Sequence, residues 1–414
     1  MKPGSFMVVF QWLRSRSRRI AMALAFAVSV LAGSYFVDSY PLAVGGETAT
    51  AQWIERVAYV LGRRPDHVPD SVLLVNVAYD KTLVPYDALF TADRDETRRA
   101  PAGHVAVTDR RKLADFLQAA AGAPYRYIVL DIRFDDDIPA SDPASQRLFA
   151  LIDSLPRVVF ARHEDALVHP LAPAAKSAFS DYHTTVSETN MVKYPILKHA
   201  SLSIPAVMYA RGDSARFRTW GGLTFDRGRL CRRSVFIEAP VRASGWMRNS
   251  LNNPLGAPPC NYYNLGASLL AAPDSADAIR TLVTDRIVVV GDYIDDVHTT
   301  YAGTLAGPLV NLNAYIALCR GSHLVRILPS LLLFLLYFFI AYGLISRHNP
   351  FDYIPLLRRH RSVVLRAAVY FVGFTTLLSL TAVLFYIVGG TVYSVVFPSL
   401  CFTILNLWIR KPFL

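Results

Sequence analysis

The 414-residue sequence lacks the short motifs that mark many enzymes. It contains no G-x-S-x-G, no phosphate-binding loop, no H-E-x-x-H and no G-x-G-x-x-G pattern. Those motifs carry a serine nucleophile, a nucleotide phosphate, a catalytic zinc or a dinucleotide. Their absence gives no sequence reason to predict an enzyme, so a non-enzymatic role is expected.

The sequence also lacks acidic residues in its long apolar stretches. Four windows approach or exceed the roughly 20 apolar residues that cross a bilayer, at 20–37, 324–345, 363–388 and 391–409. A proton-coupled transporter normally keeps an ionisable group inside the membrane, so these windows argue against one. The first window is either an uncleaved anchor or a secretory signal that is removed; in both cases the following domain is exported.

The net charge of +11 is concentrated in three short segments. The N-terminus, the loop after the second window together with Arg366, and the C-terminus hold 12 basic residues and one acidic residue. The remainder is neutral and shows no basic stripe, so no nucleic-acid partner is expected. The positive-inside rule places these segments in the cytoplasm. This predicts a multi-pass protein of the bacterial inner membrane, in contact with lipid, with a large periplasmic domain.

The predicted divisions follow from this charge map. They are a cytoplasmic N-terminus at 1–19, membrane helices at 20–37, 324–345, 363–388 and 391–409, a periplasmic domain at 38–323, a cytoplasmic loop at 346–362 and a tail at 410–414.

The exported region alternates short β-branched runs with amphipathic stretches. This pattern predicts an α/β domain, with a mostly parallel sheet and helices on both faces. Strands are expected at 71–78, 125–130, 158–161 and 287–290, and helices at 51–61, from 108 to 117, from 142 onward and at 309–318. Residues 165–285 are less regular; strands are expected there at 204–210, 217–220 and 234–237, and loops at 252–254, 258–259 and 261–264.

Acidic residues follow three of the expected strands, at Asp80, Asp131 and Asp292. The carboxyl ends of parallel strands form the ligand-binding edge of an open sheet. Three further candidate ligands lie on the same loops: Asp135, Asp296 and His298. Such an edge is suited to a divalent cation or a cationic ligand, and no other cofactor is expected. The alternative is that these acids cap helices and loops.

Two cysteines, Cys231 and Cys260, lie well inside the exported region. The oxidising periplasm allows them to form a disulfide, which would stabilise the loop between them by roughly 3–4 kcal/mol. The alternative is two unlinked small core residues.

Several motifs resemble the second CHASE-type family of extracellular sensor domains. The matching residues are Asp80 to Leu83 after the first expected strand, Asp131, Phe134 and Asp142 around the second, and Gly291, Asp292, His298, Gly307, Asn313 and Ala314 near the membrane. The resemblance implies an extracytoplasmic sensor followed by three membrane helices. Members normally continue into a kinase or cyclase, whereas only the five residues 410–414 follow the last window here.

We therefore expect a membrane-bound sensor of a periplasmic ligand that signals through a separate partner or as a homodimer. Two alternatives stay open: a membrane-tethered, metal-dependent hydrolase, and a structural subunit of an envelope complex.

Overall fold

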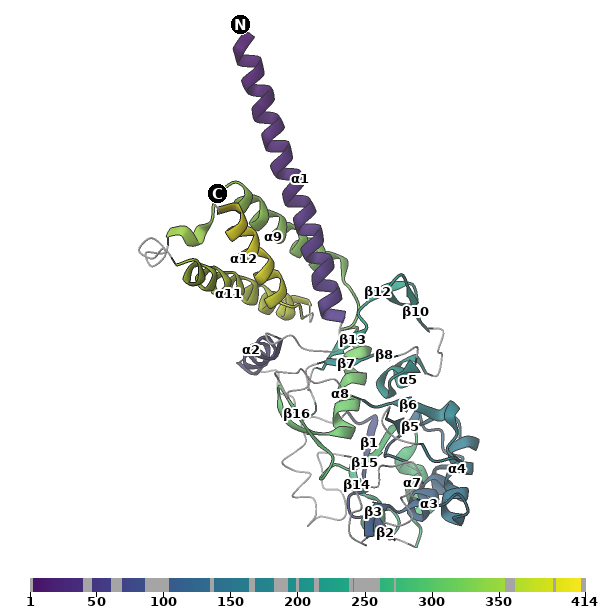
Figure 1. Cartoon of the computed structure of the whole chain (residues 1–414). Helices are drawn as coiled ribbons and strands as arrows, with labels where there is room; N and C mark the ends of the chain where they lie inside the picture. The colour runs from purple at the N-terminus through teal and green to yellow at the C-terminus, as the bar shows by residue number, and fades with distance from the viewer. Residues whose placement is uncertain are drawn as a thin grey trace, which may run out of the picture.

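A computed structural model describes most of the chain as an α/β domain joined to a bundle of apolar helices (Figure 1). The described residues are 3–39, 47–60, 69–85, 104–134, 138–163, 168–181, 193–198, 201–211, 216–237, 241, 261–271, 273–353, 362–389 and 392–410.

A six-stranded parallel sheet forms the centre of the α/β domain. Its strands, in spatial order, are β14 (Tyr262–Asn264), β1 (Val72–Asn76), β15 (Ile287–Gly291), β4 (Tyr127–Asp131), β5 (Val158–Arg162) and β6 (Ser177–Phe179). Residues 72–76 and 287–291 are buried throughout, as expected for strands covered on both faces. The predicted α/β class is confirmed.

Helices cover both faces of this sheet. On one face lie α3 (Arg110–Ala120), α4 (Pro143–Ser154) and α7 (Ser275–Val283), and on the other α5 (Ile204–Ala210) and α8 (Gly307–Cys319). Successive side chains of β15 alternate accordingly: Val288 and Val290 pack with the first group, and Val289 with the second. The carboxylates of Asp109 and Asp142 accept backbone N–H bonds at the starts of α3 and α4.

Two predictions in the irregular region were wrong. Residues 204–210 form helix α5, not a strand, because Pro205 suits a first helical turn. Ile204 and Met208, four residues apart, face the sheet, while Ala206 packs in a separate cluster with α8. The stretch at 262–264, expected as loop, is edge strand β14, paired with β1. Short apolar runs do not distinguish helix from strand.

Smaller elements surround the sheet. Hairpin β2 (Lys81–Pro85) and β3 (His104–Thr108) follows β1, and β16 (Val297–Thr300) and β17 (Gly303–Ala306) precede α8. Strand β7 (Lys193–Pro195) pairs with β13 (Ser234–Phe236), and β10 (Phe217–Trp220), β11 (Leu223–Asp226) and β12 (Arg229–Cys231) form a three-stranded sheet. The remaining elements are strands β8 (Leu197–Lys198) and β9 (Ser201–Leu202), helix α2 (Glu47–Val60), and the short helices η3 (Ala174–Lys176), η6 (Leu265–Leu269) and η7 (Pro350–Tyr353).

Among the described residues, three helices are long and apolar enough to cross a membrane: residues 16–39 of α1 (Pro3–Ser39), all of α9 (Ile327–Ile345) and residues 363–387 of α11 (Val363–Gly389). The fourth window yields a shorter helix, α12 (Val396–Arg410), of 15 residues. At 1.5 Å per residue it is about 22 Å long, less than the roughly 30 Å hydrocarbon core.

The shortening of the fourth window has a visible cause. Residues 392–395 are not helical, and the backbone N–H of Ser394 donates to the Asp38 carboxylate at 3.0 Å. Pro398 then lies in the first turn of α12, where proline is tolerated. The four apolar helices pack through one cluster that includes Tyr337, Phe374 and Phe402.

Candidate functional site

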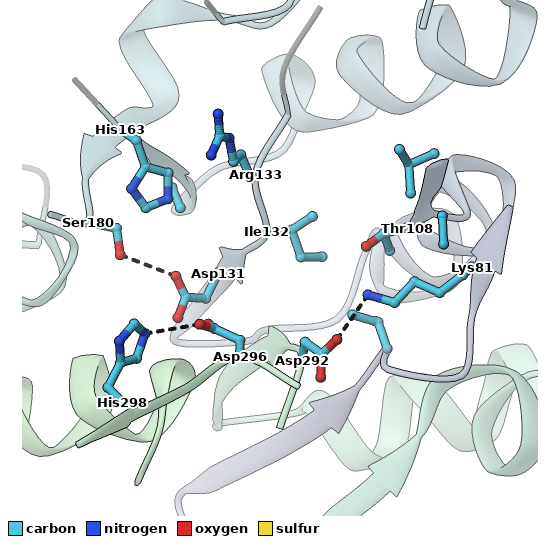
Figure 2. A pocket seen from close by; sticks show the side chains of 14 residues that line it. Lys81, Thr108, Asp131, Ile132, Arg133, His163, Ser180, Asp292, Asp296 and His298 are labelled. Atoms are coloured by element: carbon cyan, nitrogen blue, oxygen red, sulfur yellow. Dashed lines mark hydrogen bonds and ion pairs between the residues drawn. The ribbon is translucent and has the colours of Figure 1, made fainter. Parts of the chain in front are cut away.

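A pocket of about 430 Å³ opens at the carboxyl edge of the parallel sheet (Figure 2). Its described walls carry three carboxylates, from Asp131, Asp292 and Asp296. They also carry four bases, Lys81, Arg133, His163 and His298. The edge forms because Gly291 of β15 lies in register with Asp131 of β4, so the loops after both strands leave side by side.

Asp131, the last residue of β4, contacts helix α8 and the loop after β6. Its carboxylate accepts hydrogen bonds from Asn311 Nδ2 at 2.9 Å and Ser180 Oγ at 3.3 Å. Burial, and then the nearby charge of Asp296, raise its pKa to about 6, although both hydrogen bonds oppose the shift. Asp131 therefore exchanges a proton near neutral pH.

The pKa of Asp292 is shifted in the opposite direction from that of Asp131. Its carboxylate pairs with Lys81 Nζ at 2.9 Å and accepts the backbone N–H groups of Ile294 and Asp295 at 3.0 and 2.8 Å. Burial opposes its charge, but the Asp295 N–H and Lys81 outweigh that effect and lower its pKa. Asp292 is a fixed anion that closes the turn after β15.

The two histidines of the pocket each contact a carboxylate. His298 Nε2 lies 2.9 Å from Asp296, and His163 Nδ1 lies 3.0 Å from Asp181. The first pair depends on Gly307 at the start of α8, because a Cβ there would collide with the Asp296 carboxylate. The close approach of helix and loop explains the glycine.

Asp80 does not line this pocket. It is only 3% exposed, pairs with Lys112 Nζ at 2.6 Å and accepts the Gly266 N–H at 3.0 Å. Strand β1 ends at Asn76, and the intervening turn carries Asp80 toward α3 and η6. The sheet edge thus brings Asp131 and Asp292 together, with Asp296 and His298, and leaves Asp80 as a structural anchor. Asp135 lies outside the described residues.

The sequence analysis missed several pocket residues. His163 and Ser180 directly follow β5 and β6, so the same strand-end reasoning would have found them. His163 is not an acid, and β6 has only three residues, so neither position shows the pattern of an acidic residue after a long apolar run. Lys81 enters from the β2–β3 hairpin, whose position on the edge is a tertiary feature.

Within the described part of the chain, no three His, Cys, Asp or Glu side chains converge as metal ligands. Asp292 and Asp296 are instead partnered by Lys81 and His298. Among the described residues, Cys231 is a free cysteine with a fully buried side chain, and its predicted disulfide stays a prediction. Burial raises its pKa to about 12. Its predicted partner Cys260 lies outside the described residues.

Comparison with known proteins does not identify a family for this chain. No family model, no curated protein and no solved structure matches the chain. The resemblance to the second CHASE-type family therefore rests on the sequence motifs alone, and the function must be argued from the pocket and its connections.

Proposed function

We propose that the chain is a membrane-bound sensor whose pocket binds a small polar solute and whose membrane helices pass the signal on. Open α/β sheets bind ligands at the carboxyl edge of their strands. The described walls combine three acids with four bases, which suits a solute that carries both charges, such as an amino acid or a short peptide. The receiver would be a separate signalling protein or a second copy of this chain.

The observation that carries this proposal is a series of contacts from the pocket toward the membrane helices. Asp131 in the pocket accepts from Asn311 of α8, and Asn311 Oδ1 accepts from the hydroxyl of Tyr194 at 2.6 Å. Both Asn311 and Tyr194 are buried, at 1% and 0% exposure. A change at Asp131 therefore acts on strand β7, which holds Tyr194, through hydrogen bonds that water does not screen.

Strand β7 in turn contacts the end of α1. Lys193 Nζ donates to the backbone oxygen of Val37 at 3.3 Å. In the paired strand β13, Ser234 Oγ donates to the backbone oxygen of Asp38 at 3.1 Å. The Asp38 carboxylate pairs with Arg232 at 3.4 Å and accepts the Ser394 N–H just before α12. Movement of β7 and β13 would thus reach two membrane-bundle helices.

The proposed topology has both chain ends in the cytoplasm and the α/β domain in the periplasm of a bacterium. Its support is the concentration of positive charge in the three flanking segments and the three helices of spanning length. The shorter α12 would complete the crossing together with the extended residues before it.

The two alternatives have less support. A metal-dependent hydrolase needs convergent ligands, whereas the described carboxylates of the edge are partnered by Lys81, His298 and Asn311. A structural subunit does not explain a polar pocket connected through buried hydrogen bonds to the membrane helices.

The test uses the full chain in lipid nanodiscs. It is titrated with a panel of amino acids and short peptides, and amide hydrogen exchange is followed in the pocket loops and at residues 392–395. We expect a binding solute to alter exchange at both places. A panel in which nothing binds would count against the sensor, and binding with no change at 392–395 would count against signalling through these helices.

Two matched variants locate the connection. Tyr194→Phe removes the hydroxyl that donates to Asn311, so binding should persist while the response at 392–395 weakens. Tyr125→Phe removes a hydroxyl that donates to the Pro156 backbone oxygen at 2.7 Å, away from this path, and should leave the response unchanged. Equal responses in both variants would remove Tyr194 from the mechanism.

A further inference from the structure

A second pocket, of about 540 Å³, lies on the α5 side of the same sheet. The first pocket is lined by Asp131, the last residue of β4, whereas the second pocket is lined by Tyr127, the first residue of the same strand. Its walls also include Val207 of α5 and Ser201 of β9. The two pockets therefore occupy opposite ends of β4, and none of the described residues lines both.

The charge of this second pocket has a single sign among its described lining residues. Four are basic, Arg157, Arg162, Lys176 and Arg211, and none is acidic. They come from the turn before β5, the end of β5, the η3 helix before β6 and the C-terminal cap of α5. The fold thus gathers four cations from three separate segments of the chain.

These cations are not neutralised within the described part of the chain. No ion pair involves them there. Lys176 Nζ donates to the Leu155 backbone oxygen at 2.8 Å, and Arg162 Nη2 lies 3.4 Å from Ser201 Oγ. Like charges around one cavity repel, and water satisfies them less well than an anion that bridges them.

Apart from Ser177 and Ser201, the rest of the described wall is apolar and aromatic. Tyr127 is 7% exposed, and Leu202, Val159 and Val207 lie around it. Burial raises the pKa of Tyr127 to about 12, so its hydroxyl stays neutral and able to donate. A volume of this size matches an organic molecule, since small-molecule pockets commonly measure about 300–1,000 Å³.

We propose that this second pocket binds an organic anion with two or more negative charges on a small apolar frame, such as a dicarboxylate or a phosphate ester. The arginine forks would hold the carboxylate or phosphate oxygens, and the Tyr127 and Val207 side of the pocket would receive the frame. This site is separate from the solute pocket of the proposed sensor and does not depend on it.

Calorimetric titration of the full chain in nanodiscs of uncharged lipid tests the proposal. The probes are benzene-1,3-dicarboxylate and phenyl phosphate, with neutral benzene-1,3-dicarboxamide as the control of equal shape. We expect saturable binding of at least one dianion and none of the diamide. Equal binding of the diamide, or no binding of either dianion at millimolar concentration, would overturn the proposal.

Substitutions then assign the binding to this pocket. Arg157 and Arg211 have φ angles of 53° and 54°, so asparagine, which tolerates this conformation, is the replacement that preserves the backbone. Arg157→Asn, Arg211→Asn and Arg162→Gln should each weaken dianion binding by about tenfold, the value of one charge-assisted bond. Arg218→Gln, at an exposed position of β10 outside the pocket, should not weaken it.

Each variant is first checked for folding by its thermal midpoint. If Arg162→Gln fails this check, the two exposed positions, Arg157 and Arg211, decide the question. A loss of affinity in Arg218→Gln as large as in the pocket variants would mean general attraction of anions to a basic surface and would overturn the assignment.

Discussion

At the scale of single residues, Asp131 and Asp292 predict opposite dependences of stability on pH. The folded pKa of Asp131 is raised from 3.8 to about 6, so the folded state binds this proton more tightly than the unfolded chain. Its ionisation therefore costs stability above about pH 6, and the cost disappears as pH falls toward 4. Asp131→Asn should stabilise the protein by about 1–3 kcal/mol near pH 7.5 and by less near pH 5.

Asp292→Asn is the matched control. The folded pKa of Asp292 is lowered, so its contribution is present above the unfolded value of 3.8 and is lost only as pH falls through the folded value. Its substitution should destabilise the protein equally at both pH values. The measurement is the thermal midpoint in detergent at about pH 7.5 and about pH 5. An effect of Asp131→Asn that is the same at both pH values would contradict the raised pKa of Asp131 in the folded state.

Asp80 provides a second prediction at this scale. Because it is buried and holds both Lys112 and the Gly266 N–H, Asp80→Ala should destabilise the fold by about 1–3 kcal/mol. It should not change solute affinity, since Asp80 does not line the pocket. Thermal unfolding and solute titration of the same sample separate these outcomes. A loss of solute affinity without a loss of stability would show that Asp80 contributes to solute binding.

At the scale of elements, the junction between α1 and the α/β domain contains a buried ion pair between Arg232 and Asp38. Arg232 and Asp38 have side-chain exposures of 8% and 7%, and the Arg232 guanidinium lies 5.0 Å from the centre of the Tyr393 ring. Arg232→Met leaves Asp38 buried without this partner and should cost about 3–5 kcal/mol.

The double variant Arg232→Met with Asp38→Leu removes both charges and should recover much of this loss. Thermal midpoints and resistance of the full chain to trypsin are the measurements. If the double variant is less stable than Arg232→Met alone, the pair is not the stabilising feature of the junction, and the remaining contacts of Asp38 with Ser234 and Ser394 would be responsible.

At the scale of the whole molecule, the charge map predicts which parts of the chain leave the cytoplasm. A reporter that is active only in the periplasm should function when fused after Gly266 and fail after His348 or Leu414. Activity after His348 would contradict the proposed topology, because it would put the loop between α9 and α11 outside the cell. A reporter active only in the cytoplasm, fused at the same positions, should give the complementary result.

The sequence by itself determined the four central strands, β1, β15, β4 and β5, and three of the helices that pack on them, α3, α4 and α8. Runs such as Ile287–Val290 are apolar on both faces, and such runs form strands only inside a covered sheet. Asp109 and Asp142 marked the starts of α3 and α4 because capping is a local interaction between neighbouring residues. The apolar windows likewise predicted the positions of α1, α9 and α11 from composition and length alone.

Only the tertiary structure decided which of these pieces meet. The register between β15 and β4 brings Asp292 beside Asp131, while a turn of a few residues after β1 sends Asp80 elsewhere. The strand state of residues 262–264 depends on pairing with β1. The helical state of residues 204–210 depends on the packing of Ile204 and Met208 against the sheet, in addition to Pro205 in the first turn. The basic pocket gathers Arg157, Lys176 and Arg211 from separate segments. Side-chain proximity across long sequence separations is set by strand order and packing, which no local pattern encodes.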